Sequence, residues 1–133
     1  MTDTNAAGAL NLVSPSDRAR AIFAAFDARD VSTLAAHMTD DVRMRLGNAE
    51  TVEGKTAFVD AVNAFLASVG GFRHEIIDVW SDGDTLVTEL EVHYTRLDGQ
   101  QVTVPCCNVF QLRDGLVSGY RSYIDATPVY TSG

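Results

Sequence analysis

The sequence has 133 residues, of which 46% are hydrophobic and 21% charged, as expected for one globular domain large enough to bury a core. Its formal net charge of -8 repels phosphate backbones, so we expect no nucleic-acid partner. No stretch approaches the ~18 apolar residues of a membrane-spanning helix, and the N-terminus lacks the basic region of a signal peptide. We therefore expect no membrane association and a cytoplasmic location.

A helix is predicted at residues 15–29. Before it, residues 1–13 are small and polar without an apolar period, and are expected to form a mobile tail. Ser14 can cap the helix, and Pro15 suits its first position. The apolar residues at helical spacing, which should form its buried face, are Ala19, Ile22, Phe23 and Phe26. The polar face carries Arg18, Arg20, Asp27 and Arg29.

Two further helices and a short strand follow. Asp30 is a candidate cap for a helix at 31–38, and a strand is predicted at 42–46. A third helix is predicted at 55–69 and ends at a pair of glycines. Its apolar stripe consists of Phe58, Val62, Phe65, Leu66 and Val69.

The remainder of the chain is predicted to be strand and turn. Its segments are rich in β-branched and aromatic residues, and two of the breaks between them are Asp-Gly pairs, a strong hairpin signal. The predicted strands are 72–80, 85–96, 101–113 and 116–125. Helices followed by a meander indicate one α+β domain at 14–126, with three helices packed on a curved antiparallel sheet. Residues 127–133 are expected to form a C-terminal tail.

Cys106 and Cys107 are the only cysteines. Neighbours in a strand point to opposite faces, so a disulfide between them is not expected, and zinc-ligand spacing is missing. We expect two free, buried thiols. The sequence also has no phosphate-binding loop or nucleophile elbow, so no cofactor and no metal are predicted.

Five segments, in this order, resemble the nuclear-transport-factor-2-like superfamily. They are Phe26–Asp30, Thr39–Val42, Val52–Lys55, Ser81–Asp84 and Asn108–Asp125. Within the superfamily, the chain looks like the SnoaL-like polyketide cyclases and limonene epoxide hydrolase, over about residues 15 to 126. The resemblance implies a cone-shaped fold in which helices close a curved sheet around a small-molecule pocket.

The resemblance also suggests a catalytic residue. In both the cyclases and the epoxide hydrolase an acidic residue ends the last strand, and the matching position here is Asp125. The arginine and second aspartate of the epoxide hydrolase fall at Leu90 and Val92, and its tyrosine and asparagine at Met44 and Leu46. The base of ketosteroid isomerase would also fall near Leu46. The resemblance therefore implies an acid at Asp125 among apolar walls.

The last hairpin predicts which side chains surround Asp125. A two-residue loop at Asp114-Gly115 pairs Asn108 with Arg121, Cys106 with Tyr123 and Val104 with Asp125, and the alternation of a strand gives the inward face. That face would hold Val104, Cys106, Asn108, Phe110, Leu112, Gly119, Arg121, Tyr123 and Asp125. Pro105 is consistent with a bulge, which would flip the alternation near Val104.

The preceding strand has an apolar and a charged face. Leu86, Leu90, Val92 and Tyr94 are predicted to line the interior, and Glu89, Glu91 and His93 the exterior. A two-residue loop at Asp98-Gly99 would instead turn Glu91 and His93 inward. A three-residue loop is preferred, because burying these charges costs several kcal/mol unless they are paired.

These patterns predict a pocket for a small hydrophobic molecule. Asp125 would act as an acid–base group with its pKa raised by desolvation, and Tyr123 or Asn108 would hold a substrate oxygen. The predicted catalytic residues are Asp125 and Tyr123; the predicted binding residues are Asn108, Arg121, Met44, Leu46, Leu90, Val92, Tyr94 and Cys106. Alternatively, Asp125 pairs with Arg121 at the rim, and Asn108 and Arg121 form a plain cross-strand pair. His74 and His37 are interpreted as structural or surface histidines.

Two kinds of function remain open. The first is a cofactor-independent cyclase, isomerase or hydrolase. The second is a non-catalytic ligand-binding or dimerisation module. A homodimer is expected in either case, through an outer face with Val109, Tyr120 and Ile124.

Overall fold

Three helices precede a long meander in residues 14–130, the part of the chain that the computed structural model describes. The expected mobile tail at 1–13 and the last residues, 131–133, lie outside it. The helices are α2 (Pro15–Asp27), α3 (Val31–Ala36), α4 (Lys55–Ala67) and α5 (Thr127–Tyr130). The strands are β1 (Met38–Leu46), β2 (Val52–Glu53), β3 (Gly71–Asp82), β4 (Thr85–Thr95), β5 (Gln101–Arg113) and β6 (Leu116–Ile124).

The helix starts follow from local chemistry. The Ser14 hydroxyl accepts a hydrogen bond from the Asp17 amide at 3.1 Å, and the Asp30 carboxylate accepts one from the Thr33 amide at 3.1 Å. The first helix ends two residues before the prediction, because Arg29 adopts a left-handed φ of 58°. Its guanidinium donates to the Leu66 carbonyl oxygen at 3.0 Å and so ties the end of α2 to the end of α4.

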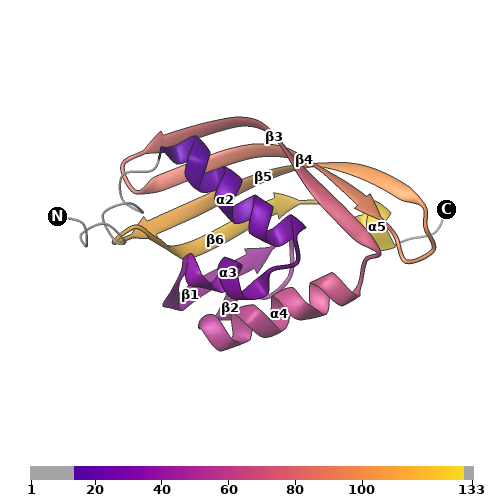
Figure 1. Cartoon of the computed structure of the whole chain (residues 1–133), viewed down its shortest axis with the longest axis horizontal. Helices are drawn as coiled ribbons and strands as arrows, with labels where there is room; N and C mark the ends of the chain where they lie inside the picture. The colour runs from indigo at the N-terminus through magenta and orange to yellow at the C-terminus, as the bar shows by residue number, and fades with distance from the viewer. Residues whose placement is uncertain (1–13, 131–133) are drawn as a thin grey trace.

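The sheet has six strands in the order β2-β1-β6-β5-β4-β3. Strands β3 to β6 form the expected antiparallel meander, and the helices lie against one face of it (Figure 1). The expectation of a wholly antiparallel sheet is wrong at one pair, because β1 runs parallel to β6. The helix α4 carries the chain away from β1 before the meander begins, so β1 can occupy the free edge of β6. The sequence prediction also missed the two-residue strand β2, which pairs with β1.

The last hairpin contains a bulge that the sequence prediction placed elsewhere. Near the turn, Leu112 pairs with Val117, but Gln111 pairs with Gly119, so Ser118 is an extra residue in β6. Beyond this bulge, Asn108 faces Ser122 and Cys106 faces Ile124. The predicted pairs of Asn108 with Arg121, Cys106 with Tyr123 and Val104 with Asp125 are therefore wrong.

The alternation of β4 and β5 agrees with the prediction. Glu91 pairs with Pro105 and His93 with Thr103, so Glu89, Glu91 and His93 point away from the helices. The inward residues of both strands are buried, including Leu90, Val104 and Phe110.

Residues 127–130 differ from the expected C-terminal tail. They form the short helix α5, in which Val129 is buried against the core. Burial of this valine, together with a hydrogen bond from Arg96 to the Pro128 carbonyl oxygen, fixes the segment beside the sheet. Within residues 14–130, no helix is long and apolar enough to cross a membrane.

Candidate functional site

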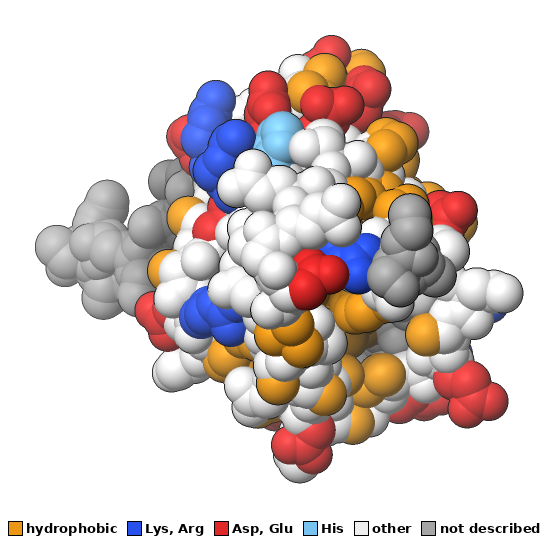
Figure 2. All heavy atoms as spheres, turned by 90° about the vertical axis from the view of Figure 1, so that its right-hand side faces the viewer, with side chains coloured by type: hydrophobic (Ala, Val, Ile, Leu, Met, Phe, Trp, Pro, Cys, Tyr) orange, Lys and Arg blue, Asp and Glu red, His pale blue; other side chains and the backbone are white. Residues whose placement is uncertain are grey.

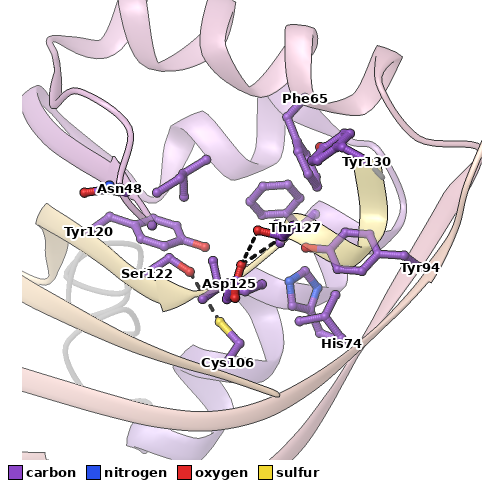
Figure 3. A pocket seen from close by; sticks show the side chains of 16 residues that line it. Asn48, Phe65, His74, Tyr94, Cys106, Tyr120, Ser122, Asp125, Thr127 and Tyr130 are labelled. Carbon is purple, nitrogen blue, oxygen red and sulfur yellow. Dashed lines mark hydrogen bonds between the residues drawn. The ribbon is translucent and has the colours of Figure 1, made fainter. Parts of the chain in front are cut away.

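A cavity of about 350 Å³ lies between the sheet and the ends of α2, α4 and α5 (Figure 3). Its rim is formed by exposed residues, among them Asn48, Asp125 and Tyr130. Its interior is lined by buried residues of the helices and of the inward faces of β4, β5 and β6, and most of it is apolar. A largely apolar cavity of this size with a few polar groups is the usual form of a small-molecule site.

His74, which lines this cavity, interacts with Asp27 behind it. His74 comes from the inward face of β3, and Asp27 is the last residue of α2. The His74 Nδ1 atom lies 2.6 Å from Asp27 Oδ1, and the His74 amide donates to the same carboxylate at 3.1 Å. The histidine side chain is only 8% exposed. Among the described residues, its Nε2 atom has no hydrogen-bond partner, which leaves it available to a ligand.

Two buried phenols, Tyr94 and Tyr120, line the same cavity. They are 5% and 2% exposed, and burial raises the pKa of both hydroxyl groups, so the phenols stay protonated. In Figure 3 both oxygens point toward the middle of the cavity. Neither oxygen has a hydrogen-bond partner among residues 14–130, whereas buried tyrosines usually have one. Each phenol can therefore donate to an oxygen atom of a ligand.

Cys106 and Ser122 lie deeper and interact with each other. The Cys106 sulfur is 3.2 Å from Asn108 Oδ1 and 3.3 Å from Ser122 Oγ. Burial raises the pKa of the Cys106 thiol, so the group is a neutral wall residue rather than a nucleophile. Both cysteines are free, as expected; Cys107 is half-buried on the opposite face.

Asp125 lies on the cavity wall, at the exposed rim. Its Oδ1 atom accepts hydrogen bonds from the Thr127 hydroxyl at 2.6 Å and from the Thr127 amide at 3.1 Å. These two bonds lower the pKa of Asp125, with the hydroxyl making the larger contribution. The expectation of a raised pKa is therefore wrong, because the carboxylate is solvated and hydrogen-bonded rather than enclosed by apolar groups.

The other predicted site residues divide into three groups. Leu46, Val92, Tyr94 and Cys106 line the cavity. Met44, Leu90 and Asn108 point inward but are buried in the core rather than in the cavity wall. Arg121 and Tyr123 lie on the outer face of the sheet, and Tyr123 is 59% exposed. Their predicted roles as binding and catalytic residues of the pocket are wrong, because the bulge at Ser118 reverses the alternation of β6.

Sequence analysis missed four residues of the site. Asp27 was placed on the polar face of its helix and His74 among structural histidines. The alternation of Phe72, His74 and Ile76 could have shown that His74 points inward. Tyr120 and Ser122 were missed through the same bulge that misplaced Arg121 and Tyr123.

A second polar cluster lies on the outer face. Glu75, Glu91 and His93 bring their ligand-type atoms within 4.8 Å of one another. His93 Nε2 lies 2.8 Å from Glu75 and Nδ1 lies 2.9 Å from the Thr103 hydroxyl. Both ring nitrogens of His93 are therefore satisfied by protein groups.

The structure is an α+β domain whose helices and sheet enclose a largely apolar cavity, and comparison with known proteins identifies the family. Residues 19–120 match the model of the SnoaL-like domain, and the chain belongs to this family. No curated protein matches the sequence.

Solved structures share the nuclear-transport-factor-2-like fold. A protein of unknown function from Burkholderia pseudomallei is similar at 16% identity and a TM-score of 0.82, over 91% of this chain and 100% of that one. An LEH-like epoxide hydrolase from Mycobacterium tuberculosis is 22% identical, with a TM-score of 0.74 over 87% and 86% of the two chains. A hypothetical protein with a ketosteroid isomerase-like fold from Catenulispora acidiphila, in complex with trimethylamine, is 15% identical, with a TM-score of 0.78 over 84% and 88% of the two chains.

Proposed function

We propose that this protein is a cofactor-independent isomerase or cyclase that moves a proton on a small, largely apolar carbonyl compound. The observation that carries the proposal is the His74 ring, which lines a largely apolar cavity, is fixed through Nδ1 by Asp27, and has an Nε2 atom without a hydrogen-bond partner among the described residues. Histidine is the side chain best suited to exchanging protons near neutral pH. The fold is shared with a protein described as an LEH-like epoxide hydrolase and with a hypothetical protein of ketosteroid isomerase-like fold that holds trimethylamine, which is consistent with a small-molecule site.

The proposed step begins with His74 Nε2 taking a proton from the carbon next to the substrate carbonyl. The electron pair of the broken C–H bond forms the enolate, whose negative charge resides on oxygen. The hydroxyls of Tyr94 and Tyr120 donate hydrogen bonds to that oxygen, and the Asp27 carboxylate stabilises the charged imidazole. His74 then returns the proton to a different carbon. In a cyclase, the enolate carbon instead attacks a second carbonyl of the same molecule to close a ring, the π electrons of that carbonyl move to its oxygen, and His74 gives the proton to the resulting alkoxide.

Deuterium exchange tests the proposal without knowledge of the natural substrate. Small cyclic ketones and apolar hydroxy-ketones are incubated in D₂O with the protein, and loss of the α-proton signal is followed by NMR. We expect exchange above the uncatalysed rate, reduced ~10²-fold or more by His74→Asn, the usual contribution of an acid–base residue. His93→Asn, on the outer face, is the matched control and should leave the rate unchanged.

The phenols have their own matched control. Tyr94→Phe and Tyr120→Phe should each slow exchange, because each removes a donor to the enolate oxygen, whereas Tyr123→Phe should not. If ligands bind in thermal-shift assays but no ketone exchanges in any variant, the alternative of a non-catalytic binding protein is supported. Exchange that survives His74→Asn would contradict the proposed mechanism.

We also infer that the protein forms a homodimer through the outer face of the sheet. Trp80, Val109 and Tyr123 lie there, and Trp80 is 50% exposed. Acidic side chains gather on the β3–β4 half of this face, such as Glu89, and arginines on the β1–β6 half, such as Arg121. A twofold axis between the halves would place acidic side chains opposite basic ones and apolar side chains against each other. Tyr120 and Ile124, which the sequence prediction assigned to this face, point inward instead.

Light scattering should give twice the 14.4 kDa chain mass. Tyr123→Glu should produce monomers, because it inserts a charge into the apolar centre of the interface. Leu97→Glu, at a turn where the leucine is exposed, is the control and should leave the dimer intact. A monomer mass for the unmodified protein at high micromolar concentration would refute the inference.

A further inference from the structure

The formally charged side chains among the described residues that line the cavity are acidic. Among the 16 described residues that line it, none is lysine or arginine, whereas Asp125 is at the rim. A second carboxylate, that of Asp27, lies directly behind His74. Figure 2, which shows the end of the molecule toward the C-terminus, has acidic side chains along its upper and lower edges and exposed hydrophobic side chains between them, with basic side chains on its left side and beside an acidic one near the middle. An anionic ligand would find no countercharge on these walls.

The nearby arginines are engaged elsewhere. Arg45 donates to the Ala49 carbonyl oxygen at 3.0 Å and to Asn48 at 3.3 Å, and its side chain leaves from the outer face of β1. Arg96 forms a salt bridge of 3.0 Å with Asp98. Neither guanidinium lines the cavity, so neither neutralises Asp125 from inside it.

Asp125 has one oxygen atom available. Thr127 occupies Oδ1 with both its hydroxyl and its amide, and no hydrogen bond joins Oδ2 to any of the described residues. The same bonds lower the pKa of the carboxyl, so it is ionised at neutral pH. They also fix its orientation at the start of α5. The rim therefore carries a negatively charged hydrogen-bond acceptor, the Asp125 carboxylate, whose orientation is fixed by Thr127.

Aromatic rings line the space next to this carboxylate. Phe26, Phe65, Tyr94 and Tyr130 all contribute to the wall. Phe65 lies edge-on to both Phe26 and Tyr94, with ring centroids 6.0 and 6.2 Å apart. Faces of aromatic rings attract ammonium groups, and the attraction grows when the cation is desolvated.

We propose that the cavity selects small organic amines, with the protonated nitrogen at the Asp125 carboxylate and the apolar body against the aromatic wall. The inference rests on the pocket of the proposed function and names the class of its substrate. It disfavours carboxylates and phosphate esters, because no lysine or arginine among the described lining residues offsets their charge and the Asp125 carboxylate repels it. In this arrangement the hydroxyls of Tyr94 and Tyr120 remain the hydrogen-bond donors to the carbonyl oxygen of the substrate.

Matched probes that differ in charge alone test this selection. We would measure binding by calorimetry for 2-naphthylmethylamine, 2-naphthylmethanol and 2-naphthoate, and for the corresponding cyclohexyl series. The measurements use the full chain near neutral pH and about 0.15 M salt, which screens long-range attraction to the acidic protein. The amine should bind about tenfold or more tightly than the alcohol, within the range of a partly desolvated cation–aromatic contact and ion pair. The carboxylate should show no binding.

Two variants distinguish the effect of the Asp125 charge at the rim from the effect of the net charge of the protein on amine binding. Asp125→Asn should lower affinity for the amine to that for the alcohol and leave the affinity for the alcohol unchanged. Asp114→Asn removes the same charge in the β5–β6 turn, outside the cavity, and its left-handed φ of 54° suits asparagine. This control should retain the full preference for the amine.

The outcomes separate this inference from the proposed function. Equal affinity for amine and alcohol, or equal effects of the two aspartate variants, would overturn the amine selection. So would the failure of both probe series to bind while His74-dependent exchange of ketones persists. Loss of exchange together with intact amine selection would instead count against the proposed reaction alone.

Discussion

The Nδ1 atom of His74 lies 2.6 Å from the Oδ1 atom of Asp27, although 47 positions separate the two residues in the sequence. The same carboxylate accepts the backbone amide of His74 at 3.1 and 3.2 Å. The Asp27 side chain at the end of α2 thus fixes both the backbone of β3 at His74 and the imidazole ring of that residue. Phe23 lies against the imidazole, with ring centroids 4.7 Å apart, and completes its orientation.

The first prediction concerns the double role of Asp27. Asp27→Asn keeps an acceptor for the His74 amide but removes the charge that stabilises the protonated ring, so ketone exchange should fall at least tenfold while the fold is retained. Asp27→Ala leaves the amide without an acceptor and should also lower the free energy of unfolding by about 1–3 kcal/mol. Urea denaturation and the exchange assay measure the two effects. Asp60→Asn on the exposed side of α4 is the control; if it matched Asp27→Asn, the specific role would be refuted.

The second prediction concerns pH and His37. Burial, and to a smaller extent the charge of Arg18, lowers the pKa of His37 below its ordinary value. The unfolded chain therefore binds this proton at a higher pH than the folded chain does, and stability falls as the pH drops below about 6.5 toward the folded pKa. Urea denaturation between about pH 7.5 and pH 5 should show this decline, with a slope of at most ~1.4 kcal/mol per pH unit for one proton. His37→Gln should flatten the profile in this range; an unchanged slope would show that other groups cause it.

The third prediction concerns the adjacent thiols. Cys106 is buried in the cavity wall with a raised pKa, and Cys107 is half-buried on the outer face. Because the thiolate is the reactive form, iodoacetamide should modify Cys107 first, at least about tenfold faster near pH 8. Mass spectrometry of Cys106→Ser and Cys107→Ser gives the two rates separately. A cavity ligand should slow the reaction of Cys106 alone, and equal protection of both thiols would contradict the assigned cavity.

The fourth prediction concerns the bulge in β6. Deleting Ser118 would restore an unbroken register, which turns Arg121 and Tyr123 toward the helices and Tyr120 and Ser122 outward. Burying a guanidinium without a partner should destabilise the fold by more than about 3 kcal/mol, visible as loss of cooperative thermal unfolding. Ser118→Ala keeps the residue count and should cost less than about 1 kcal/mol, because only a 3.3 Å bond from its hydroxyl to Gln111 is lost. A stable deletion variant with an intact cavity would show that the bulge is not needed.

Local patterns determined most of the architecture. Ser14 and Asp30 cap helices where the sequence predicts, the Asp114-Gly115 turn joins two strands, and the apolar alternation of β4 gives its inward face. Each of these features depends on residues within a few positions of one another. The same locality explains why the parallel β1–β6 pair and the short helix α5 were not predicted, since distant segments fix both.

The identity of the site depended on tertiary structure. One extra residue, Ser118, reverses which side chains of β6 point inward. Tyr120 and Ser122 therefore line the cavity, whereas Arg121 and Tyr123 lie on the outer face. Gly119, an isolated glycine within a strand pattern next to Ser118, is a sequence signal for a bulge. Which residue becomes the extra one depends on how β6 packs between β1 and β5. Likewise, the sequence places Asp27 on a polar helix face and His74 in a strand; only the packing of α2 across β3 brings their side chains together. Local chemistry selected the elements, and long-range packing decided which of their side chains share the cavity.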